Sequence, residues 1–362
     1  MIPGEYYKFV YLIIVTLCTF SCYNKYRTAG RDKVVKGNTG GTFVLALFLA
    51  VYIGLRPMGN MFGDSLGYTA HFNSLLNSSY AFTLDTENII FDNLLAWMAS
   101  LGLSVNAFFI VCALVYFLCR YWSCRKMFPN DTWAAYLLFL AAFITYSSSV
   151  NGFKAGAAAS LFCVAIAYKE DKRWWMTPLF LALSYGFHHS MHVCIAAFVV
   201  CCFYKNTKVY SLFWVFCFVC AVSHISYFQT LFAGLTDEKG ASYLITDENS
   251  GWLTGMRYDF VLYSAMPVFC GWYIKFKEKL DIPGYDFILN LYLLLNGMWM
   301  LCMYASFTNR IAALSWFMYA IVLAYPFLHS QQIFNFNKNK MFAKIMILHL
   351  AFTLFMEFVY YS

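Results

Sequence analysis

The chain has 362 residues, of which 61% are hydrophobic, 21% aromatic and only 12% charged. This composition, together with a mean hydropathy of +0.59, excludes a water-soluble domain. Lipid offers no partners for exposed backbone groups, so long apolar runs predict transmembrane helices, whereas a barrel would need short alternating strands. The net charge of +7 does not indicate nucleic-acid binding, because the Lys and Arg residues lie in short turns between apolar runs.

In chain order, the apolar runs predict an all-α, polytopic transmembrane helical bundle with about 12 crossings. The predicted crossings are 6–23, 42–55, 105–119, 133–146, 153–168, two within 174–203, 210–225, 258–273, 287–304, 311–328 and 341–361. The run 88–103 is also apolar but contains Asp92 and Asn93, which favours an interfacial or re-entrant helix. Two half-helices of the run 174–203 are expected to meet near 188–192, because broken helices are tolerated where they line a cavity. We therefore expect one integral membrane domain over 1–362.

Positive charges set the expected orientation of this bundle, since loops rich in Lys and Arg stay in the cytoplasm. The loop after the first run is such a loop, with Lys25, Arg27, Arg31, Lys33 and Lys36. From this start, both chain ends lie outside, Lys33, Lys126 and Lys277 are cytoplasmic, and Asp64, Asn151 and Asp247 are extracytoplasmic. Two outer loops, 58–87 and 226–256, would face a substrate, and the second contains Asp237, Glu238, Asp247 and Glu248.

Four cations fall at or near the outer face in this topology, although the positive-inside rule predicts few there. They are Arg56, Lys154, Arg257 and Arg310. Ionisable groups at the membrane are costly and are functional candidates for that reason. Guanidinium groups bind phosphate oxygens with two hydrogen bonds and lysine acts as a point charge, so this set favours a lipid that carries a diphosphate.

Four motifs make the chain resemble the EpsG-like, Wzy-type polymerases of bacterial exopolysaccharide, capsule and O-antigen repeat units. The motifs are Gly63-Asp64 with Tyr68 and Phe72, Asn151-x-x-Lys154-x-x-x-Ala158, Phe187-His188-x-Ser190, and Arg310 at the start of a late crossing. The resemblance spans most of the chain. Lys154 stands where the family usually has Arg, and Ala155 where it usually has Gln, which keeps the cation but weakens the expectation of a bidentate phosphate contact.

The resemblance implies glycosyl transfer on the outer face of the bacterial cytoplasmic membrane. A growing glycan on undecaprenyl diphosphate would be moved onto a second lipid-linked repeat unit, without a cofactor or metal, and with a chain-length regulator and a flippase as further partners. This reaction needs a base for the acceptor hydroxyl and cations for the leaving diphosphate. The implied assignments are Asp64 or His188 as the base, Arg56, Lys154, Arg257 and Arg310 for the diphosphate, Tyr68 for sugar stacking, and Asn151, His189 and Ser190 as further substrate-binding residues.

Structural roles are alternatives for each candidate. Asp64 precedes a helical run and could cap it. Lys154 could extend along the membrane interface, and Arg257 could anchor the chain there. His188 and His192 have the spacing of a metal-binding pair on a helix, but the neighbouring sequence does not complete a ligand set, so a hydrogen-bonded structural histidine is the other interpretation.

Other classes of membrane protein are rival interpretations. A lipid-linked oligosaccharide flippase or other secondary transporter should show inverted internal repeats, and the sequence shows none. A membrane acyltransferase would place its histidine in a region open to the cytoplasm, which this topology does not supply. Another polyprenyl-phosphate-dependent glycosyltransferase, acting from lipid to protein, commonly needs a metal motif or a large soluble domain, and neither is evident here.

Overall fold

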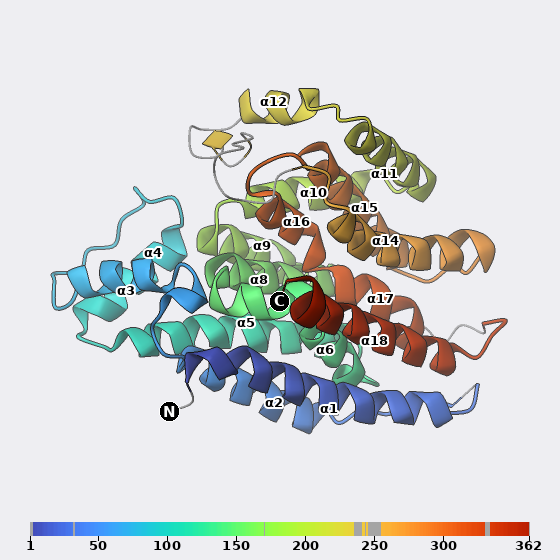
Figure 1. Ribbon diagram of the computed structural model, residues 1–362, viewed down its shortest axis with the longest axis horizontal. Helices are drawn as coiled ribbons and strands as arrows, with labels where there is room; N and C mark the ends of the chain where they lie inside the picture. Colours follow the sequence, from blue (N-terminus) through green and yellow to red (C-terminus); the bar gives the residue numbers. More distant parts are fainter. Residues whose placement is uncertain are drawn as a thin grey trace. The chain divides into compact units, whose positions relative to one another are not determined.

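The computed structural model describes residues 3–361 apart from 32, 170, 235–240, 243, 245–254 and 330–333. All regular elements in these ranges are helices and none is a strand, which confirms the predicted fold class (Figure 1). Internal contacts divide the chain into two compact units. Unit 1 comprises Met1–His192 and Phe327–Ser362, and unit 2 comprises Val193–Pro326.

Unit 1 is built around α8, whose 16 residues are almost all buried. The helices of this unit are α1 (Tyr7–Thr28), α2 (Thr39–Gly54), α3 (Ser65–Ser74), α4 (Ile89–Ser100), α5 (Val105–Met127), α6 (Thr132–Leu140), α7 (Phe143–Val150), α8 (Phe153–Tyr168), α9 (Met176–Phe187) and α18 (Lys338–Phe355), with the short helices Gly4–Tyr6, Asn60–Phe62 and Met356–Tyr360. Helix α8 packs against α5 and α9, α2 packs against α5, and α1 packs against α18. Small residues permit this close packing: a Cβ on Gly156 would lie 2.5 Å from the carbonyl oxygen of Ser148.

The predicted crossing 133–146 is broken into α6 and α7, which meet at an angle of 73°. In a membrane, the carbonyls released by such a break need side-chain partners. Here the carbonyl oxygens of Leu140 and Ala141 accept hydrogen bonds of 2.7 Å from the hydroxyls of Tyr11 and Thr353, on α1 and α18. Thr145 bonds the carbonyl of Phe139 at 2.6 Å. The break is therefore built into the packing, and α7 leads directly to Asn151.

The expected number of crossings is not confirmed. Among the described residues, four helices are long and apolar enough to cross a membrane, namely Gly4–Thr28, Val105–Met127, Thr308–Leu328 and Lys338–Tyr360. The number rises to six if two bent pairs, α6 with α7 and α11 with α12, each count as one span. Other predicted crossings form shorter helices. The 16 residues of α8, for example, rise about 24 Å, which is less than a hydrocarbon core of about 30 Å.

The run 174–203 is broken where the sequence predicts it. Helix α9 ends at Phe187, and α10 (Met191–Phe203) begins three residues after His188. His188 has an extended backbone, with φ −152° and ψ 116°. The carbonyl of Ala158 in α8 accepts a hydrogen bond of 2.7 Å from Ser184, which ties the last turns of α9 to α8.

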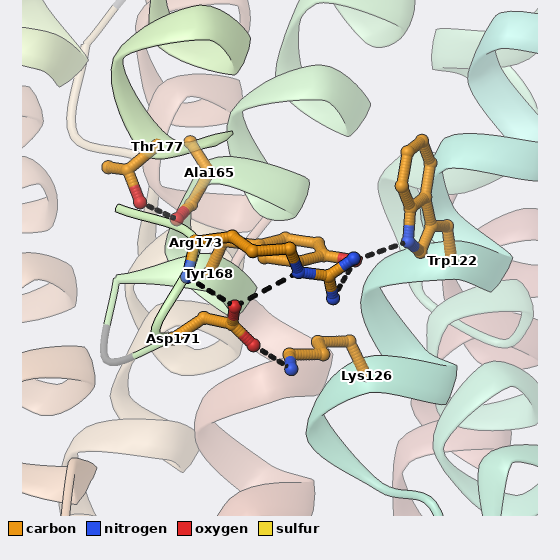
Figure 2. Close-up of polar contacts among 7 residues, drawn as sticks. All are labelled: Trp122, Lys126, Ala165, Tyr168, Asp171, Arg173 and Thr177. Carbon is orange, nitrogen blue, oxygen red and sulfur yellow. Dashed lines mark hydrogen bonds and ion pairs between the residues drawn. The ribbon is translucent and has the colours of Figure 1, made fainter. Parts of the chain in front are cut away.

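A cluster of charged and aromatic side chains joins the far end of α8 to α5 (Figure 2). We call its residues, Trp122, Lys126, Tyr168, Asp171 and Arg173, the turn cluster. Asp171 is bonded by Lys126 and accepts from the backbone N–H and Nε of Arg173 at 2.8 and 3.2 Å. These hydrogen bonds, the one from Lys126 first, hold the pKa of the Asp171 carboxyl well below its ordinary value. The hydroxyl of Tyr168 accepts from Trp122 at 3.0 Å and from Arg173 at 3.3 Å.

Unit 2 has a core in which indole and amide groups are hydrogen-bonded. Its helices include most of α10, with α11 (Thr207–Val222), α12 (Tyr227–Gly234), α14 (Tyr258–Trp272), α15 (Tyr285–Leu301), α16 (Thr308–Trp316) and nearly all of α17 (Tyr319–Leu328), besides the short helix Tyr273–Lys277. Buried Asn296 accepts from Trp214 at 2.8 Å and donates to Ser315 at 3.0 Å, which ties α15 to α11 and α16. Trp316 bonds Ser264 at 2.8 Å. Asp237, Glu238, Asp247 and Glu248 of the predicted outer loop 226–256 lie outside the described residues.

Candidate active site

The turn at Gly63-Asp64 is docked on the side chain of Asn151. Gly63 has a φ of 61°, and a Cβ at this position would lie 2.2 Å from Asn151 Oδ1, so the close approach requires glycine. The same oxygen accepts a hydrogen bond of 3.1 Å from the backbone N–H of Asp64. The side chain of Asp64 is exposed and makes no capping hydrogen bond to α3. Two motifs separated by almost 90 positions in the chain thus form one turn, and capping does not account for the carboxylate.

Arg56 lies beneath this turn, with only 1% of its surface exposed. Its guanidinium donates to Ser65 Oγ at 3.0 Å and to the carbonyl of Val150 at 3.2 Å, which are the first residue of α3 and the last residue of α7. The guanidinium carbon is 4.3 Å from the ring centre of Phe109. Burial lowers the pKa of Arg56 to about 10, so the group stays charged at neutral pH. In this structure Arg56 positions the two segments that carry Asp64 and Asn151.

Lys154, three residues after Asn151, is in the first turn of α8 and lies among aromatic rings. Its ammonium is 5.2 Å from the ring centre of Phe91 on α4 and 5.8 Å from that of Tyr68 on α3. Such distances allow a cation to interact with the ring faces. Tyr68 is itself held edge-on by Phe153, at 4.9 Å between ring centres. The side chains of Lys154 and Tyr68 are both partly exposed, so a cation lies beside an aromatic surface here.

The break after α9 carries His188, His189 and Ser190, all partly exposed. Nδ1 of His188 accepts from the backbone N–H of Ser190 at 3.2 Å and lies 2.8 Å from its hydroxyl. Asn88, which is 2% exposed, accepts the backbone N–H of His189 at 3.1 Å, and its same oxygen is 3.3 Å from Nδ1 of that ring. Glu87 Oε2 is 3.9 Å from Nδ1 of His189. The two imidazoles lie nearly parallel, 5.2 Å apart.

Helix α4 connects the histidines to the rest of the site. Phe91 contacts Lys154 and also faces Phe187, the residue before His188, at 6.5 Å between ring centres. Asn88, one turn before Phe91, holds His189. The structure therefore brings together eight of the predicted site residues in unit 1, which are Arg56, Asp64, Tyr68, Asn151, Lys154, His188, His189 and Ser190. Among the described residues, no group of three His, Cys, Asp or Glu side chains is placed to hold a metal ion.

The two remaining candidates lie in unit 2. Arg257 precedes α14 and forms two hydrogen bonds with Asp259, from Nε at 3.0 Å and from Nη2 at 2.6 Å, and the side chains are 11% and 6% exposed. Its guanidinium carbon is 3.6 Å from the ring centre of Phe260. Arg310 is exposed in the first turn of α16 and lies 5.1 Å from the ring centre of Phe307. Convergence of these two cations with those of unit 1 stays a prediction.

Comparison with known families decides what kind of protein carries this arrangement. The model of the EpsG family matches residues 42–362. The chain belongs to the EpsG family. This EpsG-family chain is thereby a multi-pass membrane protein of the polysaccharide-polymerase type. No curated protein and no solved structure matches it.

Three residues of the candidate site in this EpsG-family chain were not predicted from the sequence: Asn88, Phe91 and Glu87. The run 88–103, which contains Asn88 and Phe91, was expected to form an interfacial or re-entrant helix because of Asp92 and Asn93, and in the structure these two side chains make local hydrogen bonds. Asp92 accepts from the backbone N–H of Asn88 at 3.2 Å, and Asn93 bonds three backbone groups of the preceding loop and first turn. A polar residue directly before an apolar helix was the available signal for Asn88, although only the fold shows that it meets His189.

Proposed function

We propose that this protein polymerises oligosaccharide repeat units linked to undecaprenyl diphosphate, by glycosyl transfer at the extracytoplasmic face of the bacterial cytoplasmic membrane. The observation that carries the proposal is the site of unit 1, in which an exposed carboxylate, a lysine over aromatic rings and a pair of histidines are brought together by contacts between distant motifs. Carboxylate, cation and aromatic surface are the groups that a hydroxyl, a diphosphate and a sugar ring require.

In this proposal Asp64 is the general base. Its side chain is exposed in the turn held by Asn151, where the hydroxyl of an incoming sugar can reach it. As the hydroxyl loses its proton to the carboxylate, its oxygen forms a bond to the anomeric carbon of the donor, and the bond from that carbon to the diphosphate breaks. Undecaprenyl diphosphate leaves. His188 orients the acceptor or the diphosphate through a hydrogen bond.

The cations act at different distances from the leaving group. Lys154 contacts the diphosphate as a point charge, while Tyr68 supplies a face for a sugar ring. Arg56 is buried and acts mainly by fixing the turn, adding positive charge from beneath. Arg310, in unit 2, is exposed, and its planar guanidinium is suited to bind phosphate oxygens with two hydrogen bonds. Arg257 is bound by Asp259, so it reaches a phosphate only when that pair separates.

The position of the site along α8 supports an outer location. Asn151 and Lys154 lie at one end of this helix, and the turn cluster, which contains Lys126 and Arg173, lies at the other. Positively charged turns favour the cytoplasmic side, which supports an outer position for the opposite end of α8. An outer site suits a reaction between lipid-linked units that a flippase has already delivered.

A deletion strain of the source bacterium tests this function. We expect lipid-linked single repeats to accumulate at the outer face, with loss of polymer. Complementation with Asp64→Asn should leave that state unchanged, because the base is lost at a cost on the order of 10²–10⁴ in rate. Asp85→Asn, another exposed carboxylate of the segment 58–87, is the matched control and should restore polymer. Single repeats trapped on the cytoplasmic side would instead indicate a flippase.

A further inference from the structure

We propose that the two adjacent imidazoles of the site are locked in opposite tautomers, so that His188 presents an Nε2–H donor to an oxygen of the substrate while His189 keeps a lone pair on Nε2 and is the ring that exchanges a proton. The inference rests on the proposed function for what the substrate is, but the tautomers follow from hydrogen bonds alone. Asn88 and Ser190 are the positioning residues that set them.

For His188 the deciding contact is a backbone one. The N–H of Ser190 can only donate, and it points at Nδ1 of His188 from 3.2 Å. Nδ1 must therefore carry a lone pair, and the single proton of the neutral ring lies on Nε2. If Nδ1 were protonated, its N–H would face the backbone N–H of Ser190, and two hydrogen-bond donors would repel each other. The hydroxyl of Ser190, 2.8 Å from the same nitrogen, can donate to the same lone pair. His188 is thus held as a neutral ring that donates through Nε2.

For His189 the deciding atom is Oδ1 of Asn88. Its identity as oxygen is fixed because it accepts the backbone N–H of His189 at 3.1 Å. The same oxygen lies 3.3 Å from Nδ1, so Nδ1 must be the protonated nitrogen. Nε2 then holds the lone pair of the neutral ring. Because Nδ1 keeps its proton in both charge states, any proton that this ring gains or loses passes through Nε2.

Charge favours the same division of roles. The rings are 5.2 Å apart and nearly parallel, so two positive charges at once would repel each other. The carboxylate of Glu87 lies 3.9 Å from Nδ1 of His189 and stabilises a positive charge on that ring. His188 is therefore the fixed hydrogen-bond donor, and His189 is the ring that can become cationic. The motif Phe187-His188-x-Ser190 specifies the first ring but not the second.

The first test reads the tautomers directly and needs no activity. The protein is labelled with ¹⁵N in its histidine rings, reconstituted in bilayers, and studied by solid-state NMR near pH 8, well above the ordinary histidine pKa of about 6.5. Difference spectra with His188→Gln and His189→Gln assign the two rings. We expect the proton on Nε2 in His188 and on Nδ1 in His189. The same tautomer in both rings, or the reverse pattern, overturns the proposal.

Variants of the positioning residues sharpen this reading. Asn88→Ala should release His189 from the Nδ1–H tautomer, whereas Ser190→Ala keeps the backbone N–H and should leave His188 unchanged. If Asn88→Ala does not fold, the wild-type spectrum still decides. A protein that shows the expected tautomers but makes no polymer would refute the proposed function alone, whereas reversed tautomers in an active polymerase would refute this inference alone.

The second test uses polymer formation and the shapes of two amides. The amide nitrogen of glutamine can take the place of ring Nε2, and that of asparagine takes the place of Nδ1. His188→Gln should therefore keep a donor where the substrate needs it, while His188→Asn should lose about 10- to 100-fold more activity, the effect of one hydrogen bond to a charged group. If His188 had only a structural role, the glutamine variant would not be expected to be more active than the asparagine variant. Equal activities, or a more active asparagine variant, contradict the donor role of Nε2.

Discussion

The two ends of α8 both gather cations and aromatic rings, but they use them differently. At the turn cluster, Lys126 and Arg173 share the carboxylate of Asp171 (Figure 2). At the site, Lys154 lies over the rings of Phe91 and Tyr68. A carboxylate accepts the N–H groups of a lysine, whereas a ring face interacts with its charge, so the two lysines differ in the kind of group that they face.

In the proposal, this difference separates a structural use of charge at the turn cluster from a chemical use at the site. The turn cluster fixes the connection from α8 to α9 and favours the cytoplasmic side through its excess of cations. The site holds its carboxylate, Asp64, and its cation, Lys154, on separate elements, each tied to the same short segment around Asn151.

The largest effect expected in this comparison comes from replacing the lysine at each end of α8. Lys154→Gln should reduce polymer by on the order of 10²–10³, because a preorganised charge is removed from the leaving group. Lys154→Arg should be tolerated, since the cation stays. Lys126→Gln is the matched control at the other end and should leave activity per molecule unchanged. Polymer yield, normalised to the amount of protein in the membrane, measures the effect of all three substitutions. Full activity of Lys154→Gln would contradict the placement of the phosphate-binding site in unit 1.

Arg310 tests whether unit 2 contributes to the same chemistry. Arg310→Ala should reduce polymer strongly without loss of protein from the membrane, because the residue is exposed and its removal leaves no cavity. Arg310→Lys should recover little, since a planar fork is replaced by a point charge. Arg257→Lys provides the comparison, because it makes the same substitution at a guanidinium that is bound to Asp259. Full polymer length from Arg310→Ala would confine the phosphate site to unit 1.

Much of unit 1 was predictable because its signals are local. Apolar runs indicate helices, and the polar residues 188–190 interrupt one of them where the structure has its break. The bend between α6 and α7 was not predictable, because its released carbonyls are bonded by Tyr11 and Thr353 from distant helices. Most predicted runs do form helices, but several of these helices are too short or too bent to count as candidate spans, so the number of crossings did not follow from the runs alone.

The site was predictable in its motifs but not in its contacts. Gly63 and Asn151 are both in recognised motifs, yet only the fold shows that one packs on the other. Arg56 looks like a membrane-edge cation in the sequence and is buried in the structure. Asn88 lies in no motif, because its role depends on the meeting of α4 with the end of α9.

Labelling from one side of the membrane tests the opposite orientation of the two ends. A cysteine at position 151 should react with an impermeant reagent added to intact cells, and a cysteine at position 126 should react only after the inner face is exposed. The chain has 13 cysteines of its own, so the unmodified protein is the background control. Labelling of both positions from the same side would refute the orientation of α8.

A smaller effect is expected from pH at the turn cluster. The pKa of Asp171 is lowered in the folded protein, so its contribution to stability is complete above the ordinary carboxyl pKa of about 4 and is lost as pH falls toward the lower folded value. Asp171→Asn should therefore melt below the wild type near neutral pH, and this difference should shrink below about pH 4. Melting temperatures in detergent measure it. A difference that grows on acidification would contradict the ion pairing.

Polymer formation by the purified protein tests the central claim most directly. Wild-type protein in proteoliposomes is given a purified lipid-linked single repeat, without nucleotide sugars, metal or other proteins. We predict a ladder of lengthened lipid-linked glycans, with one undecaprenyl diphosphate released for each unit added, and no ladder from Asp64→Asn. Movement of the repeat across the bilayer without any ladder would contradict the account and assign the protein to transport.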